Sequence, residues 1–230
     1  MNINFLNINF IFEINKKMSE ELESLKIVLI GESGVGKTTI ITQFIDQIFQ
    51  EDLQSTSGGT FSTKTVKCSN GKLLKLEIWD TAGQERYRSV AKMFYKDANA
   101  AILVYDITNK FSFEELKNYW AEQVMESSPK NIILAIIANK TDLMDKEQVD
   151  EEEVRNFAKK IGAFFARTSA KTSHGVNDLF LEIAKKYSGA ESALTVENKE
   201  EIEEYKRMRK ESVKITKETQ VKTNKKKKCC

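Results

Sequence analysis

Apolar and polar positions follow one another in blocks along the middle of this 230-residue chain. Short continuous apolar runs are typical of strands buried on both faces, and they occur at residues 26–31, 100–106, 131–139 and 163–168. Between them, apolar residues recur at helical spacing, which predicts helices at residues 37–49, 90–97, 111–125, 151–161 and 176–187. This alternation predicts an α/β fold, with a mostly parallel sheet covered by helices on both faces.

A hairpin completes the predicted sheet. Residues 61–68 and 72–80 have strand patterns, and the Asn-Gly turn in Ser69-Asn70-Gly71 joins them. The hairpin contributes one antiparallel edge strand, so we expect six strands in all. No apolar run approaches the ~20 residues that a membrane-spanning helix needs.

The ends of the chain differ in composition from the middle. Residues 1–20 are rich in apolar residues but lack the basic start and small-residue cleavage site of a signal peptide. We expect them to be an N-terminal extension that is disordered or, for residues 1–17, absent from the mature protein. Residues 21–188 are predicted to form one domain. Residues 189–230 are rich in lysine and glutamate with an excess of basic residues, which predicts a solvated tail.

A phosphate-binding loop follows the first predicted strand. The run Gly31-Glu32-Ser33-Gly34-Val35-Gly36-Lys37-Thr38 matches the pattern G-x-x-x-x-G-K-[ST]. In this pattern backbone N–H groups cradle phosphates, the lysine reaches the β- and γ-phosphates, and the final hydroxyl can ligate Mg²⁺. Because a strand precedes the loop and a helix follows it, the phosphates would meet a helix N-terminus. The sequence therefore predicts a P-loop NTPase domain.

A second polar segment, Asp80-Thr81-Ala82-Gly83-Gln84-Glu85, follows the strand that ends in Trp79. At that position Asp80 can hold the Mg²⁺ shell through water, and the N–H of Gly83 can bind a γ-phosphate oxygen. Gln84 can orient the attacking water. These residue types predict hydrolysis of the bound triphosphate.

The base is predicted from the ends of two later strands. In Asn139-Lys140-Thr141-Asp142 the carboxylate can accept both N–H donors of a guanine edge, whereas adenine presents the opposite pattern and would leave buried groups unpaired. The stem of Lys140 can cover the face of the base. Thr168-Ser169-Ala170-Lys171 can complete the pocket with backbone N–H groups and Lys171, although alone it is an ordinary polar turn.

Together these motifs resemble the Ras superfamily of small GTPases, and most closely its Rab branch. The resemblance covers about residues 25–187 and rests on GESGVGKTT, WDTAGQERYRSV, VYDIT, NKTD, TSAK and the final Cys-Cys. It implies a monomeric GTPase that binds GTP or GDP with Mg²⁺ and regulates vesicle trafficking at the cytoplasmic face of an intracellular membrane. It also implies an exchange factor, a GTPase-activating protein, a dissociation inhibitor and effectors as partners. A net charge of +2 gives no reason to expect nucleic-acid binding.

The resemblance also implies roles for individual residues. Gln84 matches the catalytic glutamine that positions water, and the positions that hold the metal are matched by Thr38, Thr56 and Asp80. The nucleotide-binding positions are matched by Ser33, Gly34, Val35, Gly36, Lys37, Thr38, Thr39, Phe49, Thr56, Gly83, Asn139, Lys140, Asp142, Ser169, Ala170 and Lys171. The aromatic triad through which Rab proteins meet effectors is matched by Phe61, Trp79 and Phe94. Phe49 and the triad residues could equally be plain packing residues.

Two departures from the family pattern leave alternatives open. Ser57, followed by Gly58 and Gly59, stands where Rab proteins carry a bulky aliphatic residue. This departure supports a nucleotide-binding scaffold with negligible hydrolysis as a second hypothesis, against which Gln84 and Thr56 argue. Arg167 replaces the acidic residue that is common before Thr-Ser-Ala-Lys, so the base pocket can differ. A P-loop kinase or ATPase is a third hypothesis, against which Asp142 argues.

The last six residues predict a membrane anchor. Cys229 and Cys230 follow the lysines at 225–228, and stable anchoring needs two membrane signals. The lysines would add attraction to anionic lipid. The ending is not C-a-a-X, but the resemblance implies geranylgeranylation of both cysteines.

Overall fold

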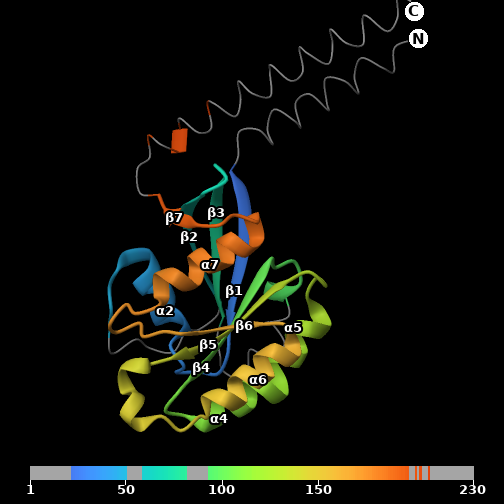
Figure 1. The fold of residues 1–230 in the computed structure, drawn as a ribbon, viewed down its shortest axis with the longest axis vertical. Coiled ribbons are helices and arrows are strands. Elements are labelled where there is room, and N and C mark those ends of the chain that lie inside the picture. The colour runs from blue at the N-terminus through green and yellow to red at the C-terminus, as the bar shows by residue number, and fades with distance from the viewer. Residues whose placement is uncertain are drawn as a thin grey trace, which may run out of the picture. The chain divides into compact units, whose positions relative to one another are not determined.

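The computed structural model describes residues 22–50, 59–81, 93–196, 200, 202, 203 and 207 (Figure 1). The chain divides into two units: residues 24–195, and the two ends of the chain taken together. In the second unit Glu200, Ile202, Glu203 and Arg207 are helical. The first unit contains all the described site residues. Among the described residues, no helix combines the length and the apolar character that crossing a bilayer requires.

A seven-stranded sheet runs through the first unit in the order β6-β5-β4-β1-β3-β2-β7. Its strands are β1 (Glu23–Ile30), β2 (Gly59–Cys68), β3 (Leu73–Thr81), β4 (Ala100–Asp106), β5 (Ile133–Asn139), β6 (Phe164–Arg167) and β7 (Ala193–Thr195). β1, β4, β5 and β6 pair in parallel, and β2 pairs antiparallel with β3 and with β7. The carboxyl ends of the parallel strands lie at the same end of the sheet, where Asp106 and Asn139 are register partners. Ligands of open α/β sheets bind at such an end.

Helices cover the two faces of the sheet (Figure 1). They are α2 (Lys37–Asp46), α4 (Lys110–Glu115), the π-helical η2 (Leu116–Trp120), α5 (Ala121–Ser127), the 3₁₀-helical η3 (Thr141–Lys146), α6 (Glu151–Ile161) and α7 (Val176–Ser188). α2 and α7 share one apolar cluster, in which the rings of Phe44 and Phe180 stack with their centroids 4.0 Å apart. Residues of α4, η2, α5 and α6 form the second cluster on the other face. The predicted α/β class is therefore confirmed.

The sheet has one strand more than the six expected from the sequence. β7 lies beyond residue 188, in the segment predicted to be tail, and pairs with Val66–Cys68 at the end of β2. Ser69 secures the approach to β7, because its Oγ accepts hydrogen bonds from the backbone N–H groups of Glu191 and Ser192, both at 3.1 Å. The predicted edge strand β2 therefore lies between β3 and β7 and pairs antiparallel with both, and β7 is the edge strand. A three-residue strand is too short to show a period in the sequence.

The observed helices differ from the predicted ones mainly in their bounds and regularity. Residues 111–125 were expected to form one regular helix, but η2 inserts a π-helical turn between α4 and α5. Of the predicted helix 90–97, residues 93–95 are helical, residues 96–97 form a turn, and the first three lie outside the described residues. The predicted N-terminal extension, residues 1–20, also lies outside them.

Candidate nucleotide-binding site

The phosphate loop between β1 and α2 depends on two glycines. Gly31 has φ +147°, and a Cβ atom there would lie 2.2 Å from the carbonyl oxygen of Val104. Gly36 has φ +95°, and its Cβ would lie 2.4 Å from Nδ2 of Asn139. No side chain fits at either place, because both the backbone angle and the neighbouring atoms exclude it. Elsewhere in the loop Val35 is buried in the core, and Ser33 and Gly34 are exposed.

Lys37, at the start of α2, turns back over the loop. Its Nζ donates hydrogen bonds to the carbonyl oxygens of Gly31 at 2.7 Å and Glu32 at 2.9 Å. Burial lowers the pKa of Lys37 to about 8, while the charges of Asp80 and Glu32 act in the opposite direction. A phosphate anion beside this amine would stabilise its ammonium form.

Thr38 and Asp80 meet next to the phosphate loop. The hydroxyl of Thr38 donates to Oδ2 of Asp80 at 2.6 Å, and Asp80 is almost fully buried at the end of β3. Mg²⁺ prefers oxygen ligands and is commonly held by one or two carboxylates together with substrate phosphates. The two side chains fit that ion. Within the described residues no group of three or more His, Cys, Asp or Glu side chains could hold a metal.

Three predicted site residues cannot be compared with this geometry. Thr56, Gly83 and Gln84 lie outside the described residues, in the two gaps 51–58 and 82–92. The predicted switch threonine and catalytic glutamine therefore remain predictions.

Asn139 connects the phosphate loop to the segment after β6. Its Nδ2 donates to the carbonyl oxygen of Val35 at 2.8 Å, and its Oδ1 accepts from the hydroxyl of Thr168 at 3.1 Å. The side chain is buried, so losing either partner would leave a desolvated polar atom. Asn139 thus fixes two loops relative to each other.

Asp142 and Ser169 come from the segments after β5 and β6. The hydroxyl of Ser169 donates to Oδ1 of Asp142 at 2.6 Å, and it accepts from the backbone N–H of Thr172 at 3.1 Å. Asp142 is exposed and Ala170 is buried. An ionised carboxylate has acceptor capacity for several donors, so Asp142 can keep this contact and still receive N–H groups from a base.

Lys140 is held by a residue whose role we did not predict. Lys140 has a left-handed backbone, with φ +67°, and its Nζ lies 2.6 Å from Oδ2 of Asp106. The other oxygen of Asp106 accepts from the backbone N–H and hydroxyl of Thr108. The sequence signal that could have identified Asp106 is its place as an acidic residue at the end of a buried strand, beside the strand that ends in Asn139.

Phe49 and Lys171 lie near each other, as their predicted sites require. The Nζ of Lys171 is 5.9 Å from the centroid of the Phe49 ring. Phe49 is half-buried and packs against the core cluster of α2 and α7. Both interpretations of Phe49, as a base-packing residue and as a core residue, are compatible with this position. Thr39 lies in the first turn of α2 and is half-buried.

The three aromatic residues of the predicted effector triad form a row. The ring centroids of Phe61 and Trp79 are 4.9 Å apart, and those of Trp79 and Phe94 are 5.7 Å apart. Phe61 is 48% exposed, so one end of the row is accessible at the surface.

A further contact of the phosphate loop was also missed. The indole Nε1 of Trp120, in the π-helical turn η2, donates to Oε1 of Glu32 at 3.1 Å. The π-helical turn that carries Trp120 has no recognisable signature in the sequence, so only the structure reveals this link.

Comparison with known proteins identifies the family. A Ras family model matches residues 26–189. Ras-related protein Rab-22A of Homo sapiens is 43% identical over 173 residues, which cover 75% of this chain and 88% of the relative. The Mus musculus Rab-22A is 44% identical over 165 residues, covering 72% and 84%. Ras-related protein Rab5 of Nicotiana tabacum is 45% identical over 168 residues, covering 73% and 83%. The chain therefore belongs to the Ras family of small GTPases, in its Rab group, and it binds and hydrolyses GTP.

Proposed function

We propose that this GTPase is a membrane-associated switch in vesicle trafficking, and that its nucleotide binds at the carboxyl edge of β1, β4, β5 and β6. One observation carries the proposed site. Asn139 is bonded to both Val35 and Thr168, and Ser169 is bonded to Asp142 nearby. Residues predicted to bind phosphate and residues predicted to bind guanine are thus joined in one place.

The phosphate end of the proposed site neutralises charge. Lys37 and the backbone N–H groups of residues 33–38 receive the phosphate oxygens. Thr38, Asp80 and Thr56 would hold Mg²⁺, which when bound would neutralise phosphate charge. If this assignment is right, replacing Thr38 with alanine should weaken retention of GDP in the presence of Mg²⁺ and reduce the difference that adding EDTA makes. An unchanged EDTA effect would contradict the metal assignment.

Hydrolysis in the proposed mechanism rests on water positioned by Gln84. Thr56 and Gly83 contact the γ-phosphate, so its loss releases the loops that carry them. Replacing Gln84 with alanine should slow single-turnover hydrolysis, with GTP affinity little changed. Hydrogen exchange should differ between the GDP and GTP forms mainly in residues 50–60 and 83–94, and equal protection of both loops would contradict the switch.

At the base end, Asp142 accepts the guanine donors and Lys140 covers the base. Ser169, Ala170 and Lys171 complete the pocket. The direct test is displacement of a fluorescent GDP analogue by unlabelled GDP or ADP. We expect displacement by GDP at far lower concentration, because adenine would leave the carboxylate and backbone groups unpaired. Equal competition by ADP would contradict the proposed guanine pocket.

The membrane role is proposed from Cys229 and Cys230 and from the relatives, which carry Rab names. Two geranylgeranyl groups would anchor the chain on the cytoplasmic face of an intracellular membrane, from which it cycles to the cytosol. Exchange factors, activating proteins, a dissociation inhibitor and effectors are the expected partners. Replacing both cysteines with serine should abolish co-flotation of the cellular protein with membranes. Unchanged flotation would contradict the anchor.

A further inference from the structure

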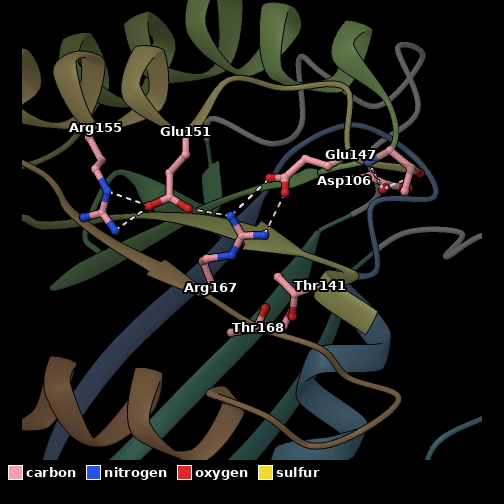
Figure 2. Close-up of polar contacts among 8 residues, drawn as sticks. Asp106, Thr141, Glu147, Glu151, Arg155, Arg167 and Thr168 are labelled. Atoms are coloured by element: carbon pink, nitrogen blue, oxygen red, sulfur yellow. Dashed lines mark hydrogen bonds and ion pairs between the residues drawn. The ribbon is translucent and has the colours of Figure 1, made fainter. Parts of the chain in front are cut away.

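Arg167, the residue that departs from the family pattern, lies at the centre of an ion-pair cluster at the end of β6 (Figure 2). Its Nη1 and Nη2 donate to the two carboxylate oxygens of Glu147 at 3.1 and 3.0 Å. Nη1 also donates to Oε2 of Glu151, the first residue of α6. On the far side of the cluster, Nε of Arg155 donates to the other oxygen of Glu151 at 2.7 Å.

The position of this cluster along the chain relates it to the base pocket. Arg167 immediately precedes Thr168 and Ser169, and Glu147 immediately follows η3, the helix that carries Asp142. The pair of Arg167 and Glu147 therefore joins the two segments that the contact between Ser169 and Asp142 also joins. It does so through a separate set of atoms.

The backbone makes the same connection rigid at a third point. Both the backbone N–H and the hydroxyl of Thr141 donate to the carbonyl oxygen of Thr168, at 3.1 and 3.0 Å. Thr141 and Thr168 are buried, and Figure 2 draws them together with the ion-pair cluster. Movement of the Arg167 side chain relative to Glu147 would thus be transmitted over only a few bonds to Ser169 and Asp142.

The geometry of the pair favours a substantial effect. The Arg167 and Glu147 side chains are 27% and 24% exposed, so solvent screens them less than a pair on the open surface. Two parallel N–H···O bonds between a guanidinium and a carboxylate also fix orientation, which a lysine cannot do.

We propose that Arg167 is a positioning residue for guanine recognition: with Glu147 and Glu151 it forms a clamp that holds the Asp142 and Ser169 segments at the spacing the base requires. This inference rests on the proposed nucleotide site. In this clamp the basic residue lies on the β6 side, and the acidic residues lie on the η3 and α6 side.

The test measures release of fluorescent GDP and of the corresponding IDP from the full chain. Hypoxanthine, the base of IDP, lacks the amino group from which Asp142 would accept a hydrogen bond. The ratio of the IDP release rate to the GDP release rate therefore reports on Asp142 itself. Replacing Arg167 with alanine should accelerate GDP release about tenfold and IDP release less, which lowers the ratio. Arg167→Lys should give an intermediate rate, because it keeps the charge without the bidentate contact.

A charge exchange and a matched control complete the design. Glu147→Arg combined with Arg167→Glu restores opposite charges between positions 147 and 167 but places two acidic side chains together at 167 and Glu151, so it should recover part of the GDP retention that Arg167→Glu alone loses. Arg155→Ala removes an arginine that pairs with Glu151 but keeps the pair between Arg167 and Glu147. It should therefore leave the release ratio unchanged. If Arg167→Ala retains GDP like the wild type, or if Arg155→Ala lowers the ratio equally, the clamp is wrong.

Failure of the proposed site would give a different result. If ADP displaces GDP from the wild-type chain as well as GDP itself does, the guanine pocket is wrong whatever the Arg167 variants do. If Arg167→Ala does not fold, Arg167→Lys and the charge exchange decide the question, because identical GDP/IDP ratios in both and in the wild type would overturn the proposal.

Discussion

At the phosphate end of the site, Lys37 is held by carbonyl groups of its own loop, whereas the base end is assembled from segments far apart in the sequence. Lys37 bonds to carbonyl groups only five and six residues away. Ser169 and Asp142 are 27 residues apart, and the bond from Asn139 to Val35 spans 104 residues. The phosphate loop therefore combines local backbone conformation with a few bonds to distant segments, whereas the base end depends entirely on contacts between distant segments.

This difference predicts how each end fails. At the phosphate end, a change in a glycine's conformation should disrupt the loop directly. At the base end, several side-chain contacts hold the segments together, so removal of one contact should weaken nucleotide binding by a limited factor. The following variants test that contrast.

The largest effect is expected at Gly36. Replacing it with alanine imposes φ +95° on a residue with a Cβ and drives that atom against Asn139. GDP affinity should fall by at least about 100-fold. Gly34→Ala is the matched control, because φ is +78° there but no atom lies within 4 Å of the added Cβ, and it should cost about tenfold or less. Equal losses in titrations of the two variants would show that strain alone, and not the contact with Asn139, matters.

The next largest effect is expected where the two ends meet. Asn139→Ala removes the bonds to Val35 and Thr168 and leaves buried partners unpaired, so GDP release should accelerate roughly 10- to 100-fold. Thr168→Val removes only the second bond and should have a distinctly smaller effect. Stopped-flow release of fluorescent GDP measures both. If Thr168→Val accelerates GDP release as much as Asn139→Ala does, the bond from Asn139 to Val35 does not contribute to nucleotide retention.

A smaller effect is expected at Asp106. Asp106→Asn removes the ion pair that fixes Lys140, and GDP affinity should fall by about two- to fivefold. Thr108→Val deletes a hydroxyl bond to the other oxygen of Asp106 and preserves the pair with Lys140, so its affinity should stay close to that of the wild type. Isothermal titration compares the two. Weaker binding by Thr108→Val than by Asp106→Asn would contradict the assigned contact.

The smallest effect on the site is expected from the far edge of the sheet. Ser69→Ala removes the acceptor for the N–H groups of Glu191 and Ser192, which precede β7. The melting temperature should fall by a few degrees, about the size expected for one or two hydrogen bonds in a domain of this length. GDP release should not change. A changed release rate would show that β7 is coupled to the nucleotide site.

The local character of the phosphate end also explains why it could be predicted from the sequence. The loop motif, its preceding strand and its following helix are contiguous. α6 was predicted with its observed bounds from the helical spacing of its apolar residues, and the structure shows local signals at both ends: Asp150 caps the start, three glutamates occupy the first turn, and Gly162 ends the helix. Such signals act within a few residues and are visible without the fold.

The contacts that could not be predicted are those between segments. The sequence showed that Arg167 departs from the family pattern but not that Glu147 and Glu151 would receive its guanidinium. It likewise contained no sign of the bond between Trp120 and Glu32, or of the pairing between β7 and β2. Each of these depends on which elements the fold places side by side, and a single sequence contains only weak signals for that.

The central claim is that Asp142, held by Ser169, reads the donor edge of guanine. The most direct measurement is the ratio of affinities for GDP and xanthosine diphosphate, in the wild type and in Asp142→Asn. Xanthine carries a carbonyl where guanine carries its amino group, and an amide can donate where a carboxylate can only accept. We predict that the wild type prefers GDP by about 100-fold or more and that Asp142→Asn prefers xanthosine diphosphate. An Asp142→Asn variant that keeps the wild-type preference for GDP would contradict the account.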